Sequence, residues 1–111
     1  MLRYLLPLTL LFLLSCEAII GGEGLVRNAT TREALHEVRV DLIVKEDVYA
    51  TTRTDEAGNF GLQKLVGAPF GLPPFQLQFQ KEGFRSVVME GDSVYGRNYL
   101  YVDLLPAGDE P

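Results

Sequence analysis

The chain has 111 residues, which is enough for one domain built around a single core. Ten basic residues face fifteen acidic ones, so the formal charge is −5 at pH 7, which argues against nucleic acid or anionic lipid headgroups as partners. Only one cysteine is present, which excludes an internal disulfide and a cysteine-ligated metal site.

Residues 1–15 have the pattern of a secretory signal peptide. Arg3 supplies a positive charge near the start, and an apolar run follows from Tyr4 to Leu14. This run is shorter than the ~20 residues that a membrane-spanning helix needs. The alternative is an uncleaved anchor that continues through Ile20, but such an anchor would have to bury Glu17 in the hydrocarbon.

The only cysteine stands at the expected cleavage point. Leu13-Leu14-Ser15-Cys16 resembles the lipobox of bacterial lipoproteins, in which the cysteine is diacylated on sulfur and becomes the mature N-terminus. The resemblance implies that Cys16 is the lipidation site and attaches the protein to a membrane of the bacterial cell envelope. Several acyl chains, at ~0.8 kcal/mol per buried methylene, make such attachment effectively permanent. Glu17 is not the aspartate that commonly retains lipoproteins in an inner membrane, so an outer membrane is favoured where the cell has one.

The rest of the chain divides into three parts. Residues 16–23 are expected to be a lipidated tether, whose seven residues after the cysteine span at most ~25 Å. Residues 24–106 are expected to be the folded domain, and residues 107–111 a frayed tail. The first strand is therefore expected to open at Gly24, and the domain is expected to lie close to the bilayer.

Apolar and polar residues alternate in several short stretches of the domain, as they do in half-buried strands. The clearest apolar sets are Val38, Val40, Leu42 and Val44, then Phe75, Leu77 and Phe79, and finally Leu100, Val102 and Leu104. No stretch after Ile20 has a convincing helical period. Six or seven short strands with turn residues between them predict an all-β fold, a seven-strand Greek-key β-sandwich.

The stretch from Thr54 to Phe60 predicts a β-hairpin around which the domain is organised. Asp55 can accept a backbone hydrogen bond inside the turn, and Gly58 can adopt the positive φ that closes a four-residue loop. Phe60 then places an aromatic ring in the core. Asp55 is interpreted as a turn cap and not as a calcium ligand, because the stretch lacks the alternating acidic pattern of a calcium loop.

A segment rich in proline and glycine runs from Leu65 to Pro74, and it is predicted to be neither a helix nor an interior strand. Two interpretations remain open for its apolar side chains. They cap one end of the sandwich, or they protrude as a stiffened loop that contacts a partner protein in the envelope or the bilayer surface. The candidate contact residues are Val66, Phe70 and Leu72.

Four motifs, in order along residues 24–106, resemble the carboxypeptidase regulatory-like domain. They are Gly24-x-Val26-x-Asn28-Ala29-x-Thr31-x-x-Ala34-Leu35-x-x-Val38-x-Val40-x-Leu42, Thr54-Asp55-x-x-Gly58-x-Phe60, Phe75-x-Leu77-x-Phe79-x-x-x-Gly83-Phe84 and Leu100-x-Val102-x-Leu104-x-Pro106. The resemblance implies a transthyretin-like seven-strand sandwich with no catalytic activity of its own. Asn28 stands where an aspartate is usual, Arg32 where a turn glycine is usual, and the segment before Phe75 is longer than the family's connector.

The residue types that an active site would need are missing from the sequence. His36 is the only histidine, so a zinc or iron site built on several histidines cannot form. A nucleophilic triad would have to join His36 to Ser86 or Ser93, and neither serine follows a nucleophile-elbow pattern. The sequence therefore predicts a protein that is not an enzyme and that needs no metal or cofactor.

Two classes of function remain. The first is a protein-interaction or structural module at the cell envelope, for which the proline-rich segment is the argument. The second is a module that binds a glycan or a peptide through exposed aromatic rings, for which the candidates are Tyr49, Tyr95, Tyr99 and Tyr101. The last two are also expected simply to cover the outer face of an edge strand.

Overall fold

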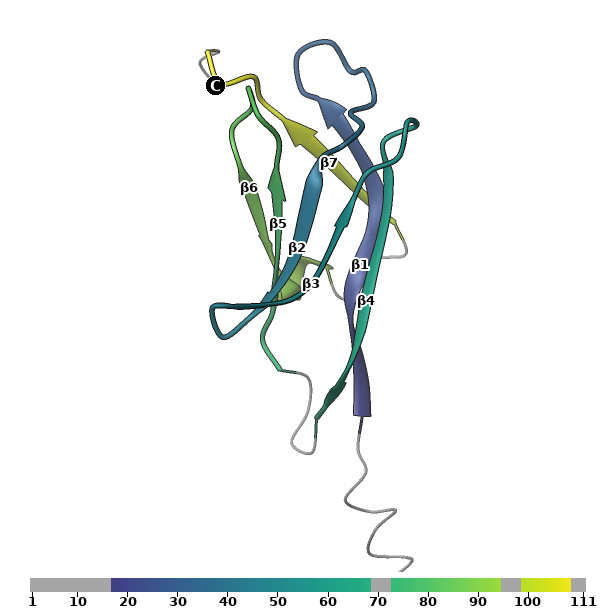
Figure 1. Cartoon of the computed structure of the whole chain (residues 1–111), viewed down its shortest axis with the longest axis vertical. Helices are drawn as coiled ribbons and strands as arrows, with labels where there is room; N and C mark the ends of the chain where they lie inside the picture. The colour runs from purple at the N-terminus through teal and green to yellow at the C-terminus, as the bar shows by residue number, and fades with distance from the viewer. Residues whose placement is uncertain (1–16, 69–72, 95–98, 109–111) are drawn as a thin grey trace, which may run out of the picture.

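The computed structural model describes residues 17–68, 73–94 and 99–108, which form an all-β sandwich of two sheets (Figure 1). One sheet has three strands in the order β4-β1-β7, and the other has four in the order β3-β2-β5-β6. β1 runs parallel to β7, and the other pairs are antiparallel. The strands are β1 (Glu17–Asn28), β2 (Arg39–Val44), β3 (Asp47–Arg53), β4 (Asn59–Gly67), β5 (Gln76–Gln80), β6 (Val87–Glu90) and β7 (Leu100–Leu104). The prediction of an all-β sandwich is confirmed.

The core lies between the sheets and contains the alternating residues predicted from the sequence. Val40, Leu42 and Val44 of β2 are buried, and so are the alternating residues of β5 and β7. The residues between them alternate to the outer face, and in β5 these are all glutamines. A one-turn helix, α2 (Gly91–Val94), follows β6 inside a segment that reads as a polar loop, and it buries Val94.

The expected tether is wrong, because residues 17–23 form the first half of β1. Their backbone pairs antiparallel with residues 61–67 of β4, and Ile20 is buried in the core. Gly21 has φ of +127°, and a Cβ atom on it would lie 1.9 Å from the carbonyl oxygen of Leu62. Glycine therefore permits a close approach of two strands, where the sequence alone favoured a flexible spacer.

The expected hairpin around residues 54–60 is also wrong. β3 pairs with β2 at the edge of the four-stranded sheet, and β4 pairs with β1 at the edge of the other sheet. The turn therefore carries the chain from one sheet to the other. Thr54 holds the start of this crossing, because its hydroxyl donates to the carbonyl of Leu35 at 2.6 Å and accepts the N–H of Val38 at 3.0 Å.

β4 extends further than the sequence predicted, because it continues through Leu65 and Val66 to Gly67. An edge strand needs a partner on one side only, and β1 supplies it along this whole length.

Residues 69–72, which precede β5, lie outside the part of the chain that the structure describes. No described helix is long and apolar enough to cross a membrane.

Candidate functional site

Asp55 and Gly58 are both engaged inside the turn that joins the sheets. The Asp55 carboxylate accepts the backbone N–H groups of Ala57 at 3.0 Å and Asn59 at 2.9 Å. Gly58 has φ of +80°, and a Cβ atom there would lie 2.8 Å from the carbonyl oxygen of Val26. These contacts give the two residues a structural role at a crowded crossing.

Of the candidate contact residues of the proline-rich segment, the structure describes Val66. Val66 lies in β4 opposite Ala18, is half-buried and packs against the core. Such packing argues against Val66 as an exposed contact. Phe70 and Leu72 lie outside the described residues, and so does the expected lipidation site, Cys16.

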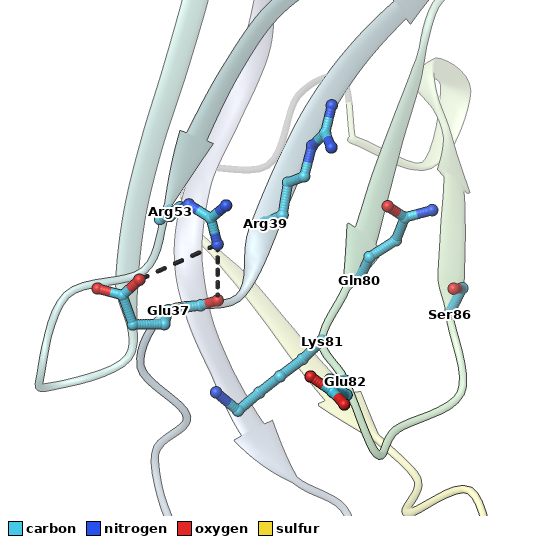
Figure 2. A pocket seen from close by; sticks show the side chains of 7 residues that line it. All are labelled: Glu37, Arg39, Arg53, Gln80, Lys81, Glu82 and Ser86. Carbon is cyan, nitrogen blue, oxygen red and sulfur yellow. Dashed lines mark hydrogen bonds and ion pairs between the residues drawn. The ribbon is translucent and has the colours of Figure 1, made fainter.

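A hollow of about 500 Å³ opens on the outer face of the four-stranded sheet, and we call it the charged hollow (Figure 2). Arg39 and Arg53 reach it from β2 and β3, Gln80 from the end of β5, and the other lining residues from the turns beside these strands. The complete lining is Glu37, Arg39, Arg53, Gln80, Lys81, Glu82 and Ser86. Three cations against two carboxylates make the hollow basic in a chain that is acidic as a whole.

Arg39 and Arg53 occupy directly opposite positions on β2 and β3. Like charges at opposite positions of neighbouring strands repel each other and reduce stability. Arg53 makes a long ion pair with Glu37, in which its Nη1 lies 4.0 Å from a carboxylate oxygen (Figure 2). The same Nη1 donates to the carbonyl oxygen of Glu37 at 3.5 Å. Lys81 donates from Nζ to the carbonyl oxygen of His36 at 2.8 Å.

Asp41 fixes the position of the Arg39 guanidinium. The Arg39 Nε donates to Asp41 Oδ1 at 3.0 Å, and the Thr51 hydroxyl donates to the same oxygen at 2.6 Å. The Asp41 side chain is only 5% exposed, although strand alternation puts it on the outer face of the sheet. A buried carboxylate held by two donors keeps the arginine in one orientation.

A second exposed surface lies on the outer face of the three-stranded sheet. The rings of Tyr99 and Tyr101 have centroids 5.3 Å apart, and Tyr101 on β7 is 66% exposed. The Arg27 guanidinium lies 5.8 Å from the Tyr101 ring centroid and pairs with Asp103 at 3.1 Å. The Tyr99 hydroxyl donates to the side-chain oxygen of Asn59. Tyr101 thus covers an edge strand as the sequence predicted.

The residues weighed for catalysis are dispersed. His36 is exposed in the loop before β2, Ser86 lines the charged hollow, and Ser93 is exposed in α2. Within residues 17–68, 73–94 and 99–108, no three His, Cys, Asp or Glu side chains are grouped so that they could hold a metal ion.

The charged hollow was missed from the sequence because its residues come from separate strands and turns. The available clue was that Arg39 and Arg53 both fall at outward positions of strands that the sequence joins by a short turn.

Comparisons with protein-family models, with curated proteins and with solved structures found no match.

Proposed function

We propose that this chain is a lipid-anchored, non-catalytic interaction module of a bacterial cell envelope that presents the charged hollow to a carboxylate of a partner protein. The motifs that resemble the carboxypeptidase regulatory-like domain support the module as a whole. A three-stranded sheet packed on a four-stranded sheet is consistent with that family's transthyretin-like sandwich.

The observation that carries the proposal is the pair of arginines, Arg39 and Arg53, at directly opposite backbone positions of β2 and β3, both of which line the charged hollow. Among the described residues, Asp41 takes the Nε–H of Arg39, so the terminal N–H groups remain available to a ligand. Within the same part of the chain, Arg53 has only the long contacts to Glu37. A carboxylate placed between the two arginines would relieve their repulsion and accept several charge-assisted hydrogen bonds.

The position of Arg39 is set before any ligand arrives, because its Nε donates to Asp41, whose carboxylate also accepts the Thr51 hydroxyl. Preorganised groups lose less conformational entropy on binding, so a weakly charged surface can still select one partner. The acidic partner also fits the charge pattern of the hollow, which is basic within an acidic chain.

Titration with a hexaglutamate peptide, followed by calorimetry, tests this assignment. We expect binding that weakens as salt is raised, and a loss of about two- to fivefold in affinity for Arg53→Gln, since the Arg53 side chain is 60% exposed and an exposed charged contact is worth roughly 0.5–1 kcal/mol. Lys64→Gln is the matched control, because Lys64 is an exposed cation on the other sheet. Equal affinities for the wild type and Arg53→Gln would contradict the proposal, and so would equal binding of hexalysine.

The anchor is supported by the sequence Leu13-Leu14-Ser15-Cys16 after a short apolar run. Metabolic labelling with a palmitate analogue should tag the wild type and not Cys16→Ala. An unlabelled wild type, or one that high salt removes from membranes, would refute the anchor.

A second candidate function is favoured by the exposed pair Tyr99 and Tyr101. Two neighbouring exposed aromatic rings can stack on the apolar faces of sugars or on a peptide. If the protein is a glycan-binding module, Tyr101→Ala should abolish binding to soluble peptidoglycan fragments, and Arg53→Gln should leave it intact. The reverse pattern with hexaglutamate would favour the charged hollow.

A further inference from the structure

The first half of β1 and the second half of β4 form a two-stranded ribbon beyond the body of the three-stranded sheet. β7 pairs with β1 only from Gly24 onward, so among the described strands residues 17–23 pair with β4 alone. Figure 1 shows these two strands projecting past the others, toward the end at which the chain enters the domain. We call residues 17–20 with residues 64–67 the ribbon tip.

Two large apolar side chains are exposed at the ribbon tip. Ile19 is 58% exposed and Leu65 is 55% exposed, and they are cross-strand partners, so they form one apolar patch on the outer face. The opposite face of the ribbon packs against the core through Ile20 and Val66. Single exposed apolar residues are ordinary, but a matched pair at the end of an edge ribbon favours association with another apolar surface.

The position of the ribbon in the chain indicates that this apolar surface is the lipid bilayer. Ile19 is three residues from Cys16, a span of at most ~11 Å of extended chain. Because residues 17–23 are a strand and not a spacer, an acyl anchor at Cys16 holds the ribbon tip at the bilayer. The uncleaved alternative has the same consequence, because the apolar run from Tyr4 to Leu14 also ends next to the ribbon.

We propose that Ile19 and Leu65 insert into the interfacial region of the bilayer and fix the orientation of the sandwich on the membrane. This inference rests on the proposed anchoring at Cys16. The acidic residues Glu17 and Glu23 on the ribbon favour zwitterionic headgroups over anionic ones. The anchor supplies the attachment, and the apolar pair selects one orientation of the domain.

The absence of tryptophan from the chain makes a direct test possible. The full chain is expressed, acylated by its host, purified from membranes and reconstituted in phosphatidylcholine vesicles with or without brominated acyl chains. Ile19→Trp and Leu65→Trp are compared with Val48→Trp, whose site is equally exposed but lies on β3 of the other sheet.

Interfacial side chains lie ~5–10 Å into the boundary between headgroups and acyl chains, so brominated lipid should quench the indole at positions 19 and 65 at least about twofold. The indole at position 48 should be unaffected. Anchored protein whose indoles at positions 19 and 65 behave like that at position 48 would overturn this inference and leave the proposed function intact.

Two other outcomes also overturn it. Protein that does not associate with vesicles refutes both the anchor and the orientation that depends on it. Indoles that are shifted to the blue but not quenched by brominated lipid would show that a second protein chain, and not lipid, covers the ribbon tip.

Discussion

The ring of Phe60 on β4 meets the ring of Phe79 on β5 edge to face, with centroids 5.3 Å apart and an interplanar angle of 73°. The two strands belong to different sheets, so the pair joins the layers of the sandwich. Phe60 is the first core residue after the turn that crosses between the sheets, and both rings are buried. The crossing is therefore secured by packing at its end as well as by hydrogen bonds at its start.

Replacement of Phe60 by alanine should reduce the free energy of unfolding by roughly 3–5 kcal/mol, because it removes a buried ring and leaves a cavity. That is a large part of the stability of a domain of this size. Phe60→Leu is the control, and it should cost less, about 1.5 kcal/mol, since it keeps most of the volume but loses the edge-to-face contact. Chemical denaturation measures both. A midpoint for Phe60→Ala close to that of the wild type would show that this ring does not support the core.

Gly58 and Gly83 have similar φ angles but different surroundings. Substitutions at the two positions therefore distinguish the cost of positive φ from the cost of a steric clash. Gly58 has φ of +80° and Gly83 has φ of +88°. A Cβ atom at position 58 would lie 2.8 Å from the carbonyl oxygen of Val26, whereas nothing lies within 4 Å of one at position 83. Gly83→Ala should therefore cost about 1 kcal/mol, the ordinary penalty for positive φ.

Gly58→Ala should cost clearly more, about 2–4 kcal/mol, because the backbone around Val26 must also move. Thermal and denaturant unfolding of the two variants make the comparison. Equal losses at both positions would mean that the crossing turn is less crowded than the structure indicates.

The turn between β2 and β3 can be improved. Val44 pairs with Asp47, and the two residues between them, Lys45 and Glu46, have φ of 50° and 71°. Positive φ at both positions is the pattern of a type I′ turn, which prefers Asn-Gly. The double substitution Lys45→Asn and Glu46→Gly should raise the free energy of unfolding by about 1 kcal/mol.

Glu56→Gly is the control for that prediction. Glu56 is an exposed turn residue that is not among those with positive φ, so glycine there should lower stability slightly by adding freedom to the unfolded chain. Stabilisation by both changes, or by neither, would be inconsistent with the assigned turn.

Strand alternation made much of the core predictable. Aliphatic residues occupy every second position from Val38 to Val44 and from Leu100 to Leu104, and all of these residues are buried. A buried face requires apolar residues at alternate positions, so this pattern can be recognised without knowledge of any partner strand.

Pairing could not be predicted in the same way. Gly21, Gly22 and Gly24 make the start of β1 look like a spacer, and only the neighbouring strands β4 and β7 show that small residues are needed where Leu62 and Leu100 come close. The turn at Thr54 looks like a hairpin because its hydrogen bonds to Leu35 and Val38 come from residues distant in sequence.

The charged hollow depends on the same long-range information. Arg39 and Arg53 become neighbours only through the register of β2 and β3, and Lys81 joins them only because β5 lies on the other side of β2. The sequence pattern shows that these residues face outward. It does not show that they face one another.

Asp41 and Glu37 provide a matched test of which carboxylate organises the hollow. Asp41 is buried and accepts from Arg39 at 3.0 Å and from Thr51 at 2.6 Å, so Asp41→Ala should lower the free energy of unfolding by about 1–3 kcal/mol. Glu37 is exposed and lies 4.0 Å from Arg53, so Glu37→Ala should change stability by less than about 0.5 kcal/mol. Asp41→Ala should weaken hexaglutamate binding, because it frees the Arg39 side chain from its fixed orientation. Glu37→Ala should strengthen it, because it removes a competing negative charge. Denaturation and calorimetry on the two variants measure both effects, and tighter binding by Asp41→Ala would show that the carboxylate competes with the ligand instead of positioning the arginine.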